Sequence, residues 1–297
     1  MNKIIYILFI SVVYCEDTFS IVAVDPLTHE VGSAGASCIG GSIIISDIHP
    51  GLGAIHTQSY WTGANQNYAS SLMEAGYSPN EIIESLVHND SGNNSTIRQY
   101  GIVDLIDEGR AAAFTGQNCS DYKGHIVGDT YSIQGNILLG SEILENMEQE
   151  FLNTQGNLAQ KLMASLQGAN VPGADTRCLE DNLSSLSAFV RVAKHNESES
   201  NYYLDLNVNN VDFIPYHIDP IDSLQVLFDD WYLNTLEYTL GDINQDQNID
   251  ILDIVSIVNI ILGYLQPNII EFLSSDINED EVINIQDIII LIAIILN

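Results

Sequence analysis

Short runs of apolar and β-branched residues predict that the chain opens with strands. Four are expected before residue 60, at residues 19–24, 31–37, 42–48 and 53–58. The first run is rich in β-branched side chains, and the second consists of small residues that allow a partner to pack closely. His49, Pro50 and Gly51 form a turn signal between the last two runs. The pattern at the start of the chain therefore predicts antiparallel hairpins.

The apolar spacing then changes to the period of a helix. Helices are expected at residues 65–74 and 79–88. The second helix has the clearest start, because Ser78 is a favoured cap, Pro79 suits the first turn and Glu81 completes a capping box.

The same alternation continues through the middle of the chain. Strands are expected at residues 99–105, 111–115, 131–136, 188–192 and 203–208, and helices at residues 141–152, 158–167 and 220–236. Strands follow strands and helices follow helices, joined by tight hairpins. This grouping predicts an α+β domain with antiparallel sheets.

The first fifteen residues have the pattern of a secretory signal peptide. Lys3 provides a basic start, residues 4–13 are apolar, and cleavage is expected after Cys15. In the alternative, Cys15 is the lipidated residue of a lipoprotein, although the bulky Tyr14 fits that pattern poorly. The sequence thus predicts a secreted or cell-surface protein.

The charge of the chain is strongly negative. It has 40 Asp and Glu against 8 Lys and Arg, a formal net charge of −32, and no Lys or Arg after Lys194. Such a field repels phosphate backbones and anionic membranes, so nucleic acid is excluded as a partner. No segment predicts a membrane-spanning helix.

Three cysteines remain after the predicted signal peptide: Cys38, Cys119 and Cys178. In an exported protein one pair is expected to form a disulfide, and Cys119 with Cys178 is the preferred pair. The absence of a Cys-x-x-Cys motif argues against a structural zinc site. His49, His56 and His125 lack the close spacing of a catalytic zinc site.

The most specific signal is a twelve-residue loop pattern that occurs twice near the C-terminus. Asp276 opens the second copy 34 residues after Asp242 opens the first, and each copy leads into an apolar helix, at residues 254–262 and 288–296. Oxygen-bearing side chains alternate along both loops, as calcium requires. The predicted metal-site positions are Asp242, Asn244, Asp246, Asn248, Asp250 and Asp253 in the first loop, and Asp276, Asn278, Asp280, Val282, Asn284 and Asp287 in the second.

These loops depart from the common calcium loop at two positions. Position 6 is Gln247 or Glu281 where glycine is usual, and position 12 is Asp where Glu is usual. With its period, ligand order and location, the pair resembles a type I dockerin. The resemblance covers residues 240–297 and implies two calcium ions and a cohesin partner on a scaffold or cell surface.

Six motifs in the preceding region resemble a second family. They are the stretches at residues 18–25, 53–58, 98–104, 115–119, 134–136 and 173–177. Together they resemble a bacterial domain of unknown function, number ten twenty-eight, over residues 18–233. That resemblance implies a four-layer αββα sandwich of the N-terminal-nucleophile (Ntn) hydrolase type. The expected organisation is a signal peptide (1–15), an Ntn-hydrolase-like domain (16–238) and a dockerin domain (239–297).

In the Ntn fold class the first residue of the mature chain is a Thr, Ser or Cys at the head of a strand. Its own α-amine, with a pKa of about 7.7 to 8.0, activates the side chain. Thr18 occupies this position, but cleavage after Cys15 leaves Glu16 and Asp17 in front of it. Thr18 is thus a catalytic nucleophile only after further trimming, and otherwise the β-branched first residue of a strand.

Several polar residues inside the motifs are candidates for substrate binding. Arg98, Asp175 and Arg177 could bind an anionic group or form structural ion pairs. His56 could contact substrate or be a hydrogen-bonded core histidine. Asn136, like Gln134, could be an oxyanion donor or bond to a loop.

Three functions follow from these residues. The first is an exported amide-bond or related hydrolase, docked to a cohesin through a calcium-dependent dockerin. The second is a non-catalytic module of the same fold that binds a glycan or peptidoglycan fragment. The third, by association with other dockerin proteins, is a part in polysaccharide breakdown, although the main domain lacks a recognisable pair of glycosidase carboxylates.

Overall fold

A computed structural model describes residues 19–198, 201–209 and 218–296. The chain divides into two compact units, one up to Phe228 and one from Asp229. The predicted signal peptide, Cys15 and Thr18 lie outside the described residues. Within the described part, no helix has the length and apolar character needed to cross a bilayer.

The first unit contains a six-stranded antiparallel sheet with β1 (Phe19–Asp25) near its centre. The strand order is β10-β9-β2-β1-β8-β7. The remaining bounds are β2 (Glu30–Ser37), β7 (Gly124–Val127), β8 (Tyr131–Gly135), β9 (Ser187–Ala193) and β10 (Leu204–Asn209). Strand β1 is paired on both sides, with β2 and β8.

A second antiparallel sheet has the order β3-β4-β5-β6. Its strands are β3 (Ser46–His49), β4 (Gly53–Gln58), β5 (Gln99–Asp104) and β6 (Arg110–Thr115). The two sheets face each other, because β1 contacts β4 and β5, and β5 contacts β8. Most residues of β1, β4 and β5 are consequently buried.

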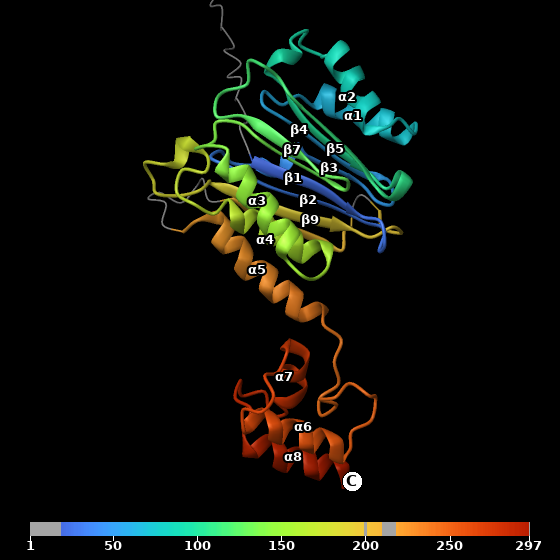
Figure 1. The fold of residues 1–297 in the computed structure, drawn as a ribbon, viewed down its shortest axis with the longest axis vertical. Coiled ribbons are helices and arrows are strands. Elements are labelled where there is room, and N and C mark those ends of the chain that lie inside the picture. The colour runs from blue at the N-terminus through green and yellow to red at the C-terminus, as the bar shows by residue number, and fades with distance from the viewer. Residues whose placement is uncertain (1–18, 199–200, 210–217, 297) are drawn as a thin grey trace, which may run out of the picture. The chain divides into compact units, whose positions relative to one another are not determined.

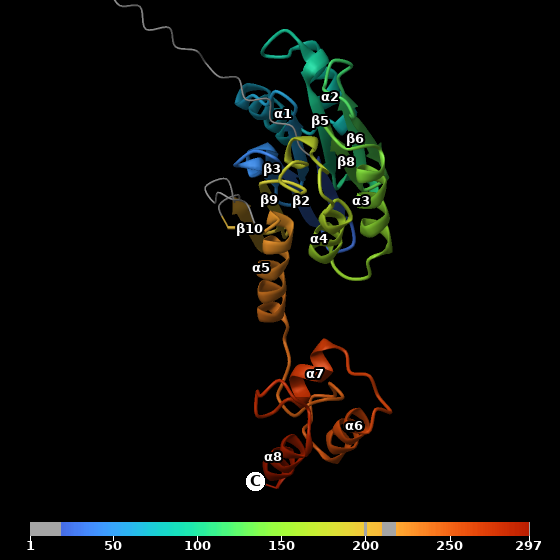
Figure 2. The same ribbon diagram turned by 90° about the vertical axis from the view of Figure 1, so that its left-hand side faces the viewer.

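Helices pack on the outer faces of both sheets (Figures 1 and 2). Helices α1 (Gly63–Glu74) and α2 (Pro79–His88) cover the four-stranded sheet, and α3 (Glu142–Asn153) and α4 (Leu158–Gly168) cover the six-stranded sheet. The predicted antiparallel sheets with helices are confirmed. The small residues of β2 allow α4 to pack closely on the sheet. A Cβ on Gly32 would lie 2.3 Å from Leu162 of α4.

Some predicted elements differ from the structure. Residues 42–48 were expected to form one strand, but Ser42–Ile45 form a 3-10 turn before β3. Gly41, at φ 82°, opens that turn with a left-handed backbone, which a continuous strand cannot contain. Strand β7 was not predicted, because it is short and only partly buried.

The second unit holds three helices, α6 (Ile251–Ile261), α7 (Ile269–Ser275) and α8 (Ile285–Ile295), after α5 (Pro220–Thr235). Its buried core is formed by Ile243, Ile257 and Leu291. Helices α6 and α8 begin three residues before their predicted starts. Asp250 and Asn284 cap them and form capping boxes with residues three positions later. Helix α7 was not predicted, although Asn268 and Glu271 give it the same signal.

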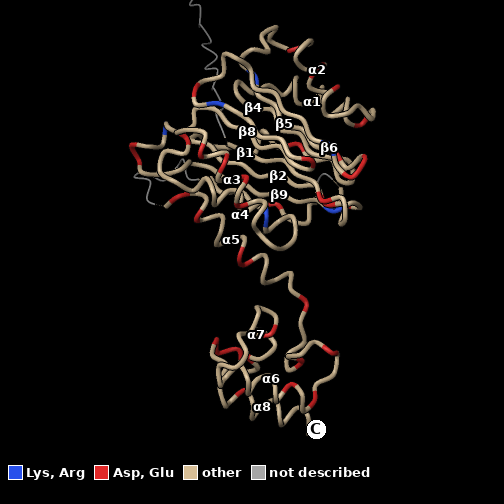
Figure 3. Tube along the Cα trace, viewed as in Figure 1, with Lys and Arg blue, Asp and Glu red and all other residues tan. Residues whose placement is uncertain are grey.

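Acidic residues are spread over both units, whereas basic residues occur only in the first (Figure 3).

Candidate functional site

The candidate site lies at the N-terminal end of β1. Phe19, the first described residue, pairs with Ala36 of β2 and with Gly135 of β8. The next residues along these neighbours are Ser37 and Asn136, and both are fully buried. Asn136 donates from Nδ2 to Gln99 at 3.0 Å. Its Oδ1 is buried and has no hydrogen-bond partner among the described residues.

An ion pair adjoins the same end of the sheet. The carboxylate of Asp175 is fully buried and accepts from Arg177 Nη2 at 2.6 Å and from the Cys38 amide at 2.9 Å. Arg177 also donates to Ser37 Oγ at 3.3 Å, and its side chain is 29% exposed. The pair therefore fixes a cation beside the end of β2.

A disulfide holds this corner, but it is not the predicted one. Cys178 pairs with Cys38, and Cys119 is buried outside this disulfide. The prediction of Cys119 with Cys178 was wrong, because Cys178 lies in a turn beside the residue that follows β2. Cys119 instead donates from its thiol to the Arg98 carbonyl at 3.3 Å.

A buried polar network links His56 to both sheets. His56 Nδ1 lies 2.9 Å from Ser20 Oγ, and Nε2 lies 2.5 Å from Ser33 Oγ. Burial, together with the positive charge of Arg191, lowers the pKa of His56 to about 3, although Asp47 opposes this shift. His56 is therefore neutral at pH 7.

Ser20 and His56 are close enough for a nucleophile and its base, but both are fully buried. Gln134 donates from Nε2 to Ser20 Oγ at 2.7 Å, so its amide is also used inside the network. We therefore interpret His56 and Gln134 as part of the packing between the sheets.

The network extends to the candidate site through two glutamines. Ser20 Oγ donates to Gln58 at 2.6 Å, Gln58 donates to Gln99 at 2.7 Å, and Gln99 accepts from Asn136. Sequence reasoning missed Ser20, Gln58 and Gln99. The signal in the sequence was that these polar residues lie within predicted strands. The apolar residues on either side of them predict that those strands are buried.

Arg98 lies apart from the Asp175 pair. It forms a buried ion pair with Asp90 at 2.7 Å and also donates to the Tyr60 carbonyl. Burial tends to raise the pKa of Asp90, but the hydrogen bonds from Arg98, Asn94 and Asn65 outweigh it and lower that pKa to about 2. The ion pair joins the loop after α2 to the start of β5.

The two C-terminal loops have matching geometry. In the first, Asp242 accepts from the amides of Asp246 and Gln247, at 3.1 and 3.0 Å. Asp253 is fully buried and accepts from the Ile243 amide at 2.8 Å and the Asp250 amide at 2.9 Å. These carboxylates therefore lie within the turn of the loop.

The second loop repeats this pattern. Asp276 accepts from the amides of Asp280 and Glu281, and the fully buried Asp287 accepts from Ile277 and Asn284. Position 6 adopts a left-handed backbone in both loops, with φ of 69° at Gln247 and 64° at Glu281. This is the conformation that favours glycine there.

The donors fit a hard cation. Carboxylate and amide oxygens alternate along each loop, and calcium binds oxygen ligands. In the part of the chain that the structure describes, no three His, Cys, Asp or Glu side chains are placed to hold a metal ion by themselves. Amide and main-chain oxygens would have to supply part of the ligand set.

Comparison with known proteins identifies both regions. Residues 18–221 match the model of DUF1028, a family of unknown function, and residues 240–296 match the type I dockerin domain. No curated protein matches the chain. Type I dockerin domains bind calcium and imply a cohesin partner, and proteins that carry them are typically extracellular or attached to the cell surface.

Two solved structures match parts of this chain. The crystal structure of protein SPO2555 from Silicibacter pomeroyi, described by the DUF1028 model, has a TM-score of 0.58 and 24% identity over 72% of this chain and 88% of that chain. Anbu (ancestral beta-subunit) from Yersinia bercovieri covers 75% of this chain and 99% of that chain at 13% identity, but its TM-score of 0.37 is too low to establish a shared fold. The chain belongs to the DUF1028 family and carries a type I dockerin domain at residues 240–296.

Proposed function

We propose that the first unit is a hydrolase of the N-terminal-nucleophile class that cleaves amide or related bonds, with Thr18 as its nucleophile. The arrangement of the elements supports this proposal. Two antiparallel sheets face each other with helices on their outer faces, which fits a four-layer αββα sandwich. The strand that follows Thr18 is β1, paired on both sides within its sheet.

The observation that carries the proposal is the Oδ1 of Asn136, which has no hydrogen-bond partner in the described part of the chain. This atom is buried at the end of β8, beside the residue of β1 that follows Thr18. An amide oxygen accepts a hydrogen bond, so it suits an N–H donor such as an α-amine better than an oxyanion. Asn136 would then hold the amine that acts as the base.

The other residues at this end would assist binding. A neutral α-amine takes the Thr18 hydroxyl proton as the oxygen attacks the carbonyl carbon, and it returns a proton to the leaving amine. Arg177, positioned by Asp175, has a side chain that is 29% exposed, and its positive charge would attract an acidic group of the substrate. Arg98 and His56 have structural roles in this proposal. Arg98 forms a buried ion pair with Asp90, and His56 belongs to the buried polar network between the sheets.

A strained β-lactone tests the proposal without a known substrate, because an activated hydroxyl opens the ring and remains acylated. We expect protein trimmed to Thr18 to gain one probe mass, measured by intact mass spectrometry and mapped to residue 18. Thr18→Ser should retain labelling, and Thr18→Ala should lose at least 95% of it (a roughly 20-fold fall, or about 2 kcal/mol in the barrier).

A matched control is protein that retains Glu16 and Asp17, because its Thr18 lacks a free amine. Circular dichroism would check that each variant is folded. Equal labelling of Thr18→Ala and the trimmed protein would place the reactive group elsewhere and overturn the assignment.

For the second unit we propose two calcium ions, one in each loop. The buried Asp242 and Asp253, and their counterparts Asp276 and Asp287, would provide carboxylate oxygens. Asn244, Asp246, Asn278 and Asp280 would provide further side-chain oxygens, and Asn248 and Val282 would contribute main-chain carbonyls. Asp250 and Asn284 already cap the helices, so they would act through the helix start or through water.

The same unit would dock to a cohesin through exposed apolar residues. Ile251 and Val255 on α6 are 68% and 52% exposed, and Ile285 and Ile289 on α8 are 64% and 61% exposed. These four residues occupy equivalent positions in the two repeats. With a signal peptide at residues 1–15, the hydrolase would be exported and attached to a cohesin-bearing scaffold or cell surface.

A further inference from the structure

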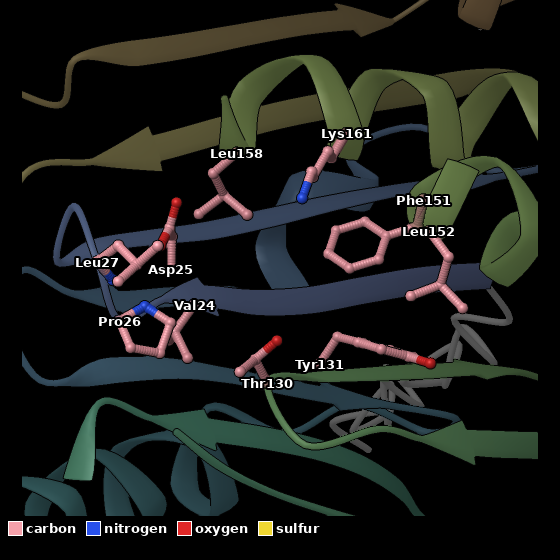
Figure 4. Close-up of a pocket in the computed structure, with 10 residues that line it drawn as sticks. All are labelled: Val24, Asp25, Pro26, Leu27, Thr130, Tyr131, Phe151, Leu152, Leu158 and Lys161. Carbon is pink, nitrogen blue, oxygen red and sulfur yellow. The ribbon is translucent and has the colours of Figure 1, made fainter. Parts of the chain in front are cut away.

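A cavity of about 240 Å³ lies at the opposite end of β1 from the candidate site. It is lined by the end of β1 and its turn, the start of β8, the end of α3 and the start of α4 (Figure 4). Strand β1 has seven residues, and a rise of about 3.3 Å per residue separates its two ends by roughly 20 Å. The cavity is therefore distinct from the Thr18 end.

Two opposite charges face this cavity. Lys161 points into it from α4, and Asp25 points into it from the end of β1 (Figure 4). Asp25 Oδ1 accepts from the amides of Leu27 and Thr28, at 2.9 and 3.4 Å. Among the described residues, neither its Oδ2 nor the Lys161 ammonium has a hydrogen-bond or ion-pair partner, and the two are not paired with each other.

The remaining wall is apolar. The rings of Phe151 and Tyr131 form a tilted pair with centroids 5.0 Å apart, and Leu158 lines the cavity from α4. The Tyr131 hydroxyl donates to Glu148 at 2.7 Å, so that the tyrosine offers the cavity mainly its ring. An apolar group can thus be buried next to the two charges.

The charges define the ligand class. The chain has a net charge of −32 and only 8 Lys and Arg, so a lysine that faces a cavity makes this site more positive than most of the protein. A purely anionic ligand would meet repulsion from Asp25 and from the whole protein, and a purely cationic one would meet Lys161. A zwitterion pairs with both groups and carries no net charge.

We propose that this cavity binds a free α-amino acid with an apolar side chain. The carboxylate would pair with Lys161, the ammonium group with Asp25, and the side chain would lie against Phe151 and Leu158. The volume favours so small a ligand, since pockets for larger molecules begin at about 300 Å³. The proposal does not rest on the hydrolase assignment, because it uses none of the residues at the Thr18 end.

The test is isothermal titration calorimetry of the full chain with L-leucine, 4-methylpentanoate and 3-methylbutylamine. These probes share an apolar tail, but only leucine carries both charges. We expect saturable binding of leucine and at least tenfold weaker binding of the other two. Absence of leucine binding at millimolar concentration, or equal binding of all three, would overturn the proposal.

Variants locate the site. Lys161→Gln removes the cation, and Asp25→Asn removes the anion while an amide oxygen still accepts from the turn. Each should weaken leucine binding at least tenfold, whereas Lys161→Arg should retain it. Lys123→Gln is the control, because Lys123 pairs with Asp121 outside the cavity. Circular dichroism would confirm that each variant is folded, and unchanged affinity in both Lys161→Gln and Asp25→Asn would contradict the assignment.

Discussion

Chelation of calcium with EGTA is expected to unfold the dockerin domain while the first unit stays folded. Asp253 and Asp287 are fully buried, and no Lys or Arg follows Lys194 to balance the acidic loops. Each accepts hydrogen bonds from backbone amides, and without a cation no positive charge balances it or the other acidic residues of its loop. The buried core of Ile243, Ile257 and Leu291 is too small to compensate for the repulsion.

The size of this effect follows from ligand linkage. With free calcium at a hundred times the dissociation constant, binding stabilises the folded domain by about 2.7 kcal/mol per site. Chelation should remove the helical circular-dichroism signal of α6, α7 and α8 and abolish the melting transition of that domain. An unchanged melting curve would contradict calcium-dependent folding.

Variants of the loops refine this test. Asp253→Ala and Asp287→Ala should each weaken calcium binding, whereas Glu237→Ala, an exposed acidic residue outside the loops, should not. Gln247→Gly is expected to make the folded loop more stable by about 1 kcal/mol. Gln247 has a positive φ, which glycine adopts more readily.

Acid is expected to destabilise the first unit through His56. Its pKa in the folded protein is about 3, against 6.5 for an ordinary histidine, so the unfolded chain takes up a proton that the folded protein excludes. The stability contributed by neutral His56 is complete above pH 6.5. It falls as the pH drops from 6.5 toward 3, by about 1.4 kcal/mol per pH unit and about 5 kcal/mol in all.

Urea unfolding between pH 7.5 and 4 measures this dependence. His56→Gln should be less stable at pH 7.5, because the bonds to Ser20 and Ser33 are altered, but its stability should change much less with pH. His88→Gln, in the last turn of α2, is the control and should follow the unaltered protein. The same pH slope in His56→Gln would show that another group takes up the proton.

The sequence predicted those elements whose structure is determined by residues close together in the chain. Helix α2 was predicted with its observed ends, because Ser78, Pro79 and Glu81 specify its start within four residues. The calcium loops were recognisable for the same reason, since all positions of each loop are contiguous. The predicted starts of α6 and α8 were three residues too late, because the capping role of Asp250 and Asn284 was not considered.

Long-range partners were not predictable in the same way. Ser20, His56 and Gln134 meet only because β1 pairs with β8 in one sheet and β4 faces them from the other, and Ser20 and Gln134 are 114 residues apart. The disulfide was assigned to the wrong cysteine for this reason, because Cys38 and Cys178 are 140 residues apart. The cavity at Lys161 likewise joins residues from four elements that no local pattern brings together.

The most direct test of the central claim is the intact mass and N-terminal sequence of the protein recovered from the exported fraction of its native host. The hydrolase proposal predicts a mature chain that begins at Thr18, with the free α-amine that the mechanism requires. A chain that begins at Glu16, or one that retains a lipidated Cys15, would contradict it and would favour a binding module attached by its dockerin.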